Sequence, residues 1–357
     1  MNKIAVIQII DSLSAGGAEV LAVNIANELA KNDDVHSYLC TTREEGILKK
    51  QLSDKVSYLF LKRKKTIDLS SIYTLRRFIK KNNIQIIHAH SSSLLIAVFV
   101  KLSFPKIKIV WHDHYGKNLS KRPLFPVKQA SFFINHIFAV NYQLLSWDSK
   151  NLFCKKITVL NNFPSFNNEN LQTNLFGNHG KRIVCMAAFR PQKDHINLLE
   201  AFRIFNEDYP DWSLHLIGND HEDAYSLMLK NYIKINNLVN KVYIYGVKSD
   251  IKHILSQASL GVLSSKSEGL PIALLEYGLA HLPVLVTDVG ACSLVVKKKE
   301  ALVPPENSEL FAKSLVKLIS NQGLLNEVAD NLSKEVNKKY NKKSIIKEVI
   351  RVYKIYV

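Results

Sequence analysis

The feature that most constrains the fold is a regular alternation of short β-rich runs with longer amphipathic stretches. In the first half of the chain the expected strands are Lys3–Ile10, Val35–Thr41, Val56–Leu61, Ile84–His88, Ile107–His112, His136–Val140 and Ile157–Leu160. The expected helices between them include Ala18–Ala30, Asp68–Lys81 and Ser93–Leu102. Strands separated by helices of this length are typical of βαβ units, whose parallel sheets are covered on both faces.

The alternation stops between residues 161 and 180 and then starts again. This segment is rich in Asn and contains Pro164, Gly177 and Gly180, a composition typical of a linker. The expected strands beyond it are Arg182–Ala188, Trp212–Gly218, Val242–Gly246, Leu260–Leu263, Val284–Thr287 and Ala301–Val303. The expected helices are Asn197–Tyr209, Glu222–Asn236, Asp250–Ala258, Ile272–Ala280 and Ser308–Ser320, followed by a Lys-rich helical tail from about residue 324.

The length of 357 residues agrees with two α/β domains of the Rossmann type. We expect an N-terminal domain at 1–164, a C-terminal domain at 165–335 and a final helix at 336–357. Ligands of open α/β sheets bind at the carboxyl ends of the strands. Two such edges that face each other across a central cleft would hold a donor on one side and an acceptor on the other.

The composition indicates a globular protein of a reducing compartment. Apolar residues make up 47% of the chain, but no run approaches the roughly 18 residues of a membrane-spanning helix. The N-terminal apolar run lacks a small-residue cleavage site, so we interpret it as a strand. The four cysteines are isolated, which favours neither a zinc site nor a disulfide framework and fits the cytoplasm.

The net charge of +17 is unevenly distributed along the chain. Residues 1–165 hold 24 Lys and Arg against 11 Asp and Glu, whereas the remainder holds 24 against 20. Basic residues follow one expected strand as Lys62-Arg63-Lys64-Lys65, and Lys117, Lys121, Arg122 and Lys128 alternate with Leu119, Leu124 and Phe125. This pattern suits the anionic inner face of a cell membrane, and a solvated loop explains it equally well.

Two carboxylates eight positions apart follow the expected strand at residues 260–263, in the segment Ser267-Glu268-Gly269-Leu270-Pro271-Ile272-Ala273-Leu274-Leu275-Glu276. Gly269 and Pro271 favour a turn and then a helix start, which directs backbone N–H groups toward a diphosphate. Glu276 would accept hydrogen bonds from a ribose, and Glu268 from a sugar ring. A first-turn acid that favours the helix dipole, beside an unrelated surface acid, explains the same pattern.

Two cations follow the first strand of the second half, in Ala188-Phe189-Arg190-Pro191-Gln192-Lys193-Asp194. Arg190 and Lys193 would bracket a pyrophosphate, since arginine offers a planar fork of donors and lysine a point charge. A leaving nucleoside diphosphate gains negative charge, which two cations can stabilise in place of a metal. The alternative is a pair of ordinary surface cations.

A paired glycine follows the first strand of the chain, in Ser14-Ala15-Gly16-Gly17-Ala18-Glu19. Gly16 and Gly17 allow the backbone to approach a ligand, but the full GxGxxG spacing is absent, and a plain β–α turn has the same composition.

Histidines close two strands of the first half, as His88-Ala89-His90-Ser91 and Trp111-His112-Asp113-His114-Tyr115-Gly116. HxH spacing can bind zinc, but a third ligand at a typical spacing is not evident. We expect His112 or His114 to donate a hydrogen bond to the transferred sugar or its acceptor, and His88 fits a core position.

Together these motifs resemble those of the retaining nucleotide-sugar glycosyltransferases of family 4, which have the GT-B fold. The resemblance covers nearly the whole chain, and its specific part is Arg190, Lys193 and the E-x7-E pattern of Glu268 and Glu276. The Gly16-Gly17-Ala18-Glu19 turn and the His-rich strand ends also match. The segment Asn161-Asn162-Phe163-Pro164 departs from the Asn-Gly-Ile-Asp of many relatives. This segment joins the two expected domains, so the departure affects the hinge between them and leaves the donor site unchanged.

The resemblance implies a role for each of these residues. Arg190 and Lys193 would bind the donor diphosphate and Glu276 the ribose, while Glu268 and the backbone of Gly269 and Leu270 would contact the donor sugar and phosphate. A first-domain histidine would lie near the sugar. The final helix would cross back to the first domain.

The implied reaction is hexosyl transfer with retention, assisted by the leaving phosphate and needing no metal or other cofactor. The expected partners are a nucleotide sugar and a glycan or lipid-linked acceptor of surface polysaccharide biosynthesis, such as lipopolysaccharide or capsule. A peripheral position on the inner membrane face is left open. The alternatives are an epimerase or a phosphorylase on the same scaffold. A nucleic-acid-binding protein would explain the charge, but no nucleic-acid motif supports it.

Overall fold

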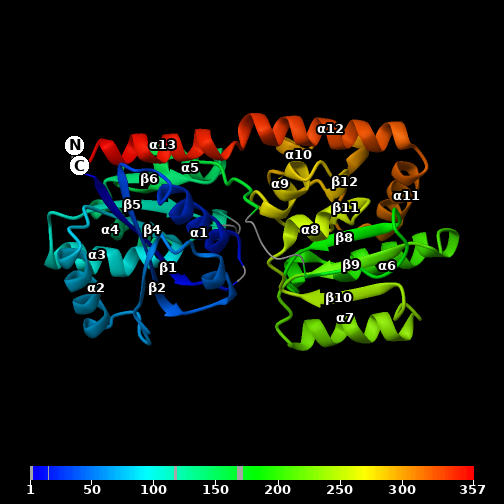
Figure 1. Ribbon diagram of the computed structural model, residues 1–357, viewed down its shortest axis with the longest axis horizontal. Helices are drawn as coiled ribbons and strands as arrows, with labels where there is room; N and C mark the ends of the chain where they lie inside the picture. The colour runs from blue at the N-terminus through cyan, green and yellow to red at the C-terminus, as the bar shows by residue number, and fades with distance from the viewer. Residues whose placement is uncertain (1–2, 15, 116–118, 167–171) are drawn as a thin grey trace. The chain divides into compact units, whose positions relative to one another are not determined.

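The computed structural model describes residues 3–14, 16–115, 119–166 and 172–357, which form two compact α/β units (Figure 1). Unit 1 comprises residues 1–162 and 342–357, and unit 2 comprises residues 163–341. The expected α/β class with two parallel sheets is confirmed. Ala15, Gly116, Lys117 and part of the expected linker lie outside the described residues.

Unit 1 contains a seven-stranded parallel sheet with the order β3-β2-β1-β4-β5-β6-β7. Its strands are β1 (Ile4–Ser12), β2 (Val35–Glu44), β3 (Ser57–Phe60), β4 (Ile86–His90), β5 (Lys108–Asp113), β6 (His136–Ala139) and β7 (Ile157–Val159). Its helices are α1 (Gly17–Leu29), α2 (Leu69–Lys81), α3 (Leu94–Ser103), α4 (Val127–Ala130), α5 (Tyr142–Asn151) and α13 (Lys342–Lys354). Helices α4 and α5 are not among the expected helices.

The alternation of side chains along β1 explains why helices cover both faces of this sheet. Ile7 and Ile9 pack in one apolar cluster with residues of α2 and α3, whereas Ile10 packs with residues of α1 on the other face. Gln8 also points to the second face, where its amide donates to the hydroxyl of Tyr353 in α13. The end of the chain therefore completes unit 1.

Unit 2 contains a six-stranded parallel sheet with the order β10-β9-β8-β11-β12-β13. Its strands are β8 (Arg182–Met186), β9 (Ser213–Ile217), β10 (Val242–Gly246), β11 (Leu260–Leu263), β12 (Val284–Thr287) and β13 (Leu302–Val303). Its helices are α6 (His195–Asp208), α7 (Ala224–Ile235), α8 (Ile251–Ser256), α9 (Ile272–Leu279), α10 (Cys292–Val295), α11 (Ser308–Ile319) and α12 (Gln322–Lys339).

The Lys-rich tail contains two helices, and the final helix expected at 336–357 begins later, at Lys342. α12 ends at Lys339 and α13 begins at Lys342, and the two belong to different units. α12 packs on α9, where a Cβ at Gly278 would lie 2.6 Å from a methyl carbon of Val336. The assignment of α13 to unit 1 agrees with the final helix that the family resemblance implied, although periodicity alone did not place its start.

Among the described residues no helix combines the length and the apolar character that crossing a bilayer requires.

Candidate active site

The loops that follow β8 and β11 carry the predicted donor-binding residues of unit 2. These two strands are neighbours in the sheet, and the chain proceeds outward from them in opposite directions. Such a topological switch point leaves a crevice at the carboxyl ends of the strands, where open α/β sheets bind their ligands. The backbone N–H of Lys266 donates to the carbonyl of Gln192 at 2.9 Å, which holds the two loops together.

Lys193 and Glu268 meet at this edge. Lys193 lies in the short helix η5 (Pro191–Lys193), and its Nζ is 2.6 Å from Oε1 of Glu268. The same carboxylate oxygen accepts from the hydroxyl of Ser265 at 2.6 Å. The Glu268 side chain is only 6% exposed, against 22% for Lys193, so the ammonium is the more accessible member of the pair.

The loop from Ser265 to Leu270 is fixed by the next loop of the sheet. The N–H of Ala291 donates to the carbonyl of Gly269 at 2.8 Å. Gly290 has a φ of +59°, and a Cβ there would lie 1.9 Å from the carbonyl oxygen of Glu268, so a side chain would displace the loop. At Gly269 a Cβ would meet nothing within 4 Å, so this side of the backbone is open, whereas Leu270 is buried.

Helix α9 carries Glu276 and begins three residues after Gly269. Its neighbour Tyr277 is buried, and the Tyr277 hydroxyl accepts from the N–H of Met186 at 2.8 Å. Gly261 of β11 makes room for this ring, because a Cβ there would lie 2.8 Å from ring carbons of Tyr277. The helix is thus anchored on β8 and β11 at the residue next to the half-buried Glu276.

Arg190 is exposed and lies at the same carboxyl edge, just after β8. Its Nε is 3.5 Å from Nε2 of His221, in the loop that follows β9. The structure therefore brings Lys193 and Glu268 into contact and leaves the Arg190 guanidinium beside a histidine.

In unit 1, Gly16 and Gly17 lie at the start of α1. Gly16 is the N-cap residue, with extended backbone angles and no side-chain cap. A Cβ on Gly16 would lie 2.3 Å from a carboxylate oxygen of Glu19, so this glycine makes room for an acid that turns back over the first helical turn. A carboxylate there interacts favourably with the helix dipole.

Five histidines form a polar column on one face of the unit 1 sheet. His88 and His90 belong to β4, whereas His112 and His114 belong to β5 and the loop after it. His90 and His112 are register partners, and adjacent rings lie 4.3–5.4 Å apart between centroids. His136 of β6 continues the column beyond Phe138.

Helix α13 and β1 supply hydrogen-bond partners for this column. The hydroxyl of Tyr353 is 2.6 Å from Nδ1 of His88, and Oε1 of Gln8 is 2.9 Å from Nε2 of His90. The other ring nitrogen of His90 lies 3.1 Å from Nε2 of His114. Burial lowers the pKa of His88 and of His114 to about 3 and that of His136 to about 4, and it lowers the pKa of His90 and His112 well below the usual value.

Nitrogens of His88, His90 and His112 lie within 4.8 Å of one another, a spacing at which a metal ion is conceivable. However, the three ring planes are inclined by only 10–29° to one another. The lone pairs lie in the ring planes, so they run side by side and do not converge on one point. A metal ion would require these rings to turn.

His112 and His114 differ in accessibility. His112 is fully buried, and neither of its ring nitrogens makes a hydrogen bond of standard geometry among the described residues, although a contact with the backbone of Leu160 partly opposes the lowering of its pKa. His114 is partly exposed at the end of the column. In this conformation only His114, of the two predicted catalytic histidines, offers surface to a ligand.

Arg122 is buried, contrary to the interpretation that placed it in a membrane-facing basic stretch. Its Nη1 lies 2.5 Å from Oδ2 of Asp113 and 3.6 Å from Oδ1 of Asp148. Its guanidinium carbon lies 4.2 Å from the ring centroid of Trp147 and 4.5 Å from that of Tyr115. Because Asp113 stands between His112 and His114 in the sequence, this buried cation fixes the end of β5.

Several polar residues around these sites were not among those predicted from the sequence. Ser265, His221 and Asp11 all follow or end a strand, so the rule that pointed to Lys193 could have found them. Arg122 had no comparable indication, because a basic residue between apolar ones looks the same whether it is buried or exposed.

Comparisons with known proteins agree with this architecture. Residues 15–162 match the family model described as Glycosyltransferase Family 4, and residues 167–339 match the model described as Glycosyl transferases group 1. The UDP-Gal:alpha-D-GlcNAc-diphosphoundecaprenol alpha-1,3-galactosyltransferase of Escherichia coli is 27% identical, over 99% of this chain and 96% of its own.

Two further similarities were found. The O-antigen biosynthesis glycosyltransferase WbnH of Escherichia coli is 25% identical over 84% of this chain and 86% of its own. The crystal structure of Anabaena Alr3699/HepE in complex with UDP and glucose superposes with a TM-score of 0.80 at 15% identity, covering 98% of this chain and 99% of that one.

Proposed function

The chain belongs to the GT-B glycosyltransferases of the family 4 type, and on this premise we propose that it transfers a sugar from a nucleotide-diphosphate sugar to a hydroxyl of a lipid-linked glycan. We further propose that the anomeric configuration is retained and that the product belongs to surface polysaccharide biosynthesis. The observation that carries the proposal is the contact of Lys193 with Glu268 at the switch point of the unit 2 sheet, beside the open backbone of Gly269.

The donor diphosphate would bind to Lys193, to Arg190 and to the backbone of the loop at Gly269. Negative charge that develops on the leaving diphosphate would be stabilised by cations that are already in place before the reaction. Lys193 is held by Glu268, so little reorganisation is needed when the donor arrives. The anchored helix α9 would present Glu276 to the ribose. The UDP bound in the Anabaena structure supports this class of donor.

The proposed chemistry needs no protein nucleophile. A leaving phosphate oxygen would accept the proton of the attacking hydroxyl on the face where the sugar–phosphate bond breaks, and the configuration would be retained. The protein would then contribute positioning and electrostatic stabilisation. We also propose that no metal ion is required, because Lys193 and Arg190 supply the positive charge. His114 would donate a hydrogen bond to the sugar or to the acceptor.

The lipid-linked acceptor is proposed from the relatives and from the charge of unit 1. One relative acts, by its name, on a sugar linked to diphosphoundecaprenol, and another takes part in O-antigen biosynthesis. Between residues 62 and 81 the chain holds eight Lys and Arg and one acid, Asp68. Asp68 caps α2 by accepting from the N–H of Ser71, so this acid already has a structural role.

The exposed side chains of this segment form a basic and apolar surface, which we name the α2 surface. The α2 surface consists of nine exposed residues: Lys62, Lys64, Lys65, Ile67, Leu69, Tyr73, Arg77, Lys80 and Lys81. Leu69 is 77% exposed and Tyr73 61%, which is unusual for large apolar side chains next to so many cations. We propose that this surface binds the anionic inner face of the membrane, where lysines attract lipid head groups and apolar groups enter the interface.

The proposed function is tested with the full-length protein in two steps. A thermal-shift screen against nucleotide sugars identifies the donor, because a ligand that binds the folded state raises the melting temperature. That donor is then incubated with and without a sugar linked to diphosphoundecaprenol. We expect nucleoside diphosphate release that depends on the acceptor, and a product whose new linkage keeps the donor's anomeric configuration by NMR. Conversion of the donor alone would identify an epimerase, and an inverted product would disprove retention.

A further inference from the structure

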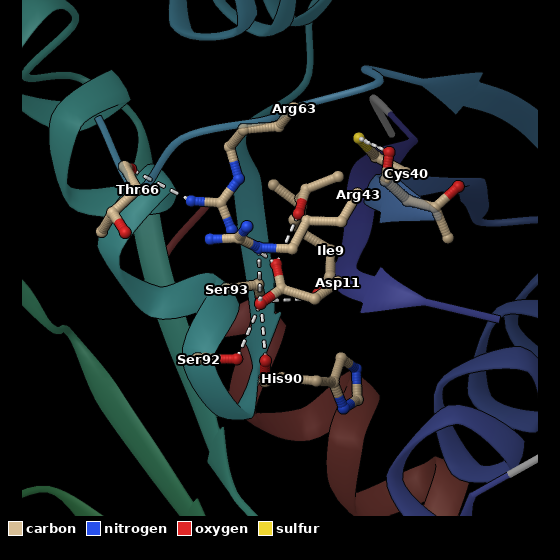
Figure 2. Close-up of polar contacts among 11 residues, drawn as sticks. Ile9, Asp11, Cys40, Arg43, Arg63, Thr66, His90, Ser92 and Ser93 are labelled. Carbon is tan, nitrogen blue, oxygen red and sulfur yellow. Dashed lines mark hydrogen bonds and ion pairs between the residues drawn. The ribbon is translucent and has the colours of Figure 1, made fainter. Parts of the chain in front are cut away.

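A second polar cluster lies at the carboxyl edge of the unit 1 sheet and is centred on Asp11, near the end of β1. Figure 2 shows the side chains of Arg43, Arg63 and Ser92 turned toward this carboxylate. Oδ1 accepts from Nη2 of Arg63 at 2.7 Å, and Oδ2 accepts from the hydroxyl of Ser92 at 2.7 Å. The hydroxyl of Thr42 also donates to Oδ1.

This cluster lies at the topological switch point of its sheet. β1 and β4 are neighbours, and the chain proceeds outward from them in opposite directions. Asp11 comes from β1, whereas Ser92 follows β4, so their hydrogen bond spans the position at which open α/β sheets bind ligands. The proposed donor residues of unit 2 occupy the equivalent position in the other sheet.

An irregularity in strand pairing brings a second cation to the cluster. Ile10 pairs with Thr41 and Ser12 pairs with Glu44, so two residues of β2 stand opposite Asp11 alone. In a regular strand Thr42 and Arg43 would point to opposite faces. Because of the bulge, the side chains of Thr42 and Arg43 both point toward the carboxylate of Asp11. Nε of Arg43 lies 3.7 Å from Oδ2. Bulges of this kind are common next to binding sites, where they redirect a side chain.

The positive charges in the cluster exceed the negative charge. The Arg63 side chain is 2% exposed, and its Nη1 donates to the carbonyl of Thr66 at 3.1 Å, so this guanidinium is held in the interior and balances Asp11. Arg43 is 39% exposed, and its guanidinium donates no hydrogen bond to any residue in the described parts of the chain. The nearby Glu45 is paired with Lys49. The charge of Arg43 is therefore available at the surface of the switch point.

We propose that Arg43, oriented by the Asp11–Arg63 ion pair, binds a phosphate group of the acceptor. Arginine suits this task, because its planar fork of donors matches phosphate oxygens and because its stem is already positioned. The inference rests on the proposed function, since a sugar linked through a diphosphate to a lipid brings such a group to unit 1. Thr42, Arg63 and Ser92 act as positioning residues that fix Asp11.

The binding test uses inorganic pyrophosphate as the probe and isothermal titration of the full-length protein. We expect two binding events in the unaltered protein, one in each unit. Arg43→Gln weakens one event by roughly ten- to a hundredfold, the effect of losing a charge-assisted contact, and Arg43→Lys retains part of the affinity. Lys193→Ala weakens the other event. Arg351→Gln, which removes an exposed arginine of α13, serves as the matched control.

The two variants separate the inference from the proposed function. Unchanged pyrophosphate binding in Arg43→Gln, with an intact thermal melting curve, overturns the inference and leaves the donor site as it stands. Unchanged binding in Lys193→Ala, together with a loss in Arg43→Gln, overturns the donor assignment and supports the inference.

A kinetic test distinguishes an acceptor phosphate from a free phosphate or a lipid head group. Two acceptors are compared in detergent without added phospholipid: a sugar linked to diphosphoundecaprenol, and the same sugar as an uncharged alkyl glycoside. Arg43→Gln should raise KM about tenfold or more for the diphosphate acceptor and leave KM for the glycoside unchanged. An equal change for both acceptors, or no change for either, would rule out an acceptor phosphate at Arg43.

Discussion

Nζ of Lys193 lies 2.6 Å from Oε1 of Glu268, so a cation that follows β8 and an acid that follows β11 form one ion pair at the switch point of unit 2. The two residues are 75 positions apart in the sequence. The hydroxyl of Ser265 donates to the same oxygen, so this oxygen of Glu268 has two hydrogen-bond donors. The Glu268 side chain is also nearly buried. Because an ammonium group has three donors, Lys193 can keep its contact with Glu268 and still donate to a negatively charged ligand.

The first prediction concerns this pair. Lys193→Ala should lower kcat/KM by roughly a hundred- to a thousandfold, because a preorganised electrostatic contact to the leaving diphosphate is lost. Lys193→Ala combined with Glu268→Gln should be less harmful than the product of the single effects, because residues in contact are not independent. Steady-state kinetics of the three variants checks this, with Lys317→Ala on α11 as control. Near-normal turnover in Lys193→Ala would contradict the donor assignment.

The second prediction separates the two histidines. His114→Ala should lower kcat, because only this ring offers surface to a ligand. His112→Leu should retain most of the activity and lose little stability through broken hydrogen bonds, since neither nitrogen of His112 makes a hydrogen bond of standard geometry among the described residues. Kinetics and denaturant unfolding of both variants test the assignment. Loss of activity in a well-folded His112→Leu protein would instead place the buried ring in the reaction.

The third prediction concerns acid stability. The pKa values of the histidine column are lowered by burial, to about 3 for His88, whereas an unfolded histidine titrates near pH 6.5. Below about pH 6.5 the unfolded chain binds protons that the folded unit does not. Each such imidazole therefore removes about 1.4 kcal/mol of stability per pH unit as the pH falls toward the folded value. Denaturant unfolding from pH 7 to 4 should show a steep loss that is shallower in His112→Leu.

The fourth prediction concerns Arg122, whose guanidinium packs against aromatic rings and pairs with Asp113. Arg122→Met leaves a buried carboxylate unpaired and should destabilise the protein by about 3–5 kcal/mol, whereas Arg122→Lys should be milder. Urea unfolding measures both. Similar stabilities of Arg122→Met and the unaltered protein would contradict a structural ion pair.

Asp148, the second acid beside Arg122, gives a pH test of the same cluster. Burial raises the pKa of Asp148, and the neighbouring Asp113 charge raises it further. Its folded pKa is higher than its unfolded value, so its contribution to stability is present at low pH and is lost as the pH rises above about 4. The stability of Asp148→Asn relative to the unaltered protein should therefore increase with pH. A pH-independent difference would contradict the raised pKa.

The fifth prediction concerns the α2 surface. Lys64→Gln with Lys65→Gln should weaken co-sedimentation with anionic liposomes roughly thirtyfold, because each lysine near the surface contributes about 1 kcal/mol. The matched control is Lys313→Gln with Lys317→Gln on α11 of unit 2. Equal binding of the two double variants would show that the α2 surface is not the contact, and a gel shift with nucleic acid at physiological salt would favour another partner.

The elements of this protein were largely predictable from its sequence, because hydrophobic periodicity and turn residues are local. The strands at 242–246, 260–263 and 284–287 lie where they were expected. The rule that ligands meet strand ends led to Lys193 and Glu268 without knowledge of strand order. The final helix was expected at 336–357 but begins at Lys342, because both helices of the Lys-rich tail are amphipathic and local patterns do not show where the first one ends.

What the sequence determined is therefore the succession of strands and helices, and with it the edge at which each polar loop lies. Only the tertiary structure decided which of these residues meet. The bulge in β2 turns Arg43 toward Asp11, the cover of α13 buries His88, and three aromatic rings enclose Arg122. Burial and pairing arise from contacts between residues far apart in the chain, and these contacts form only when the sheet is assembled.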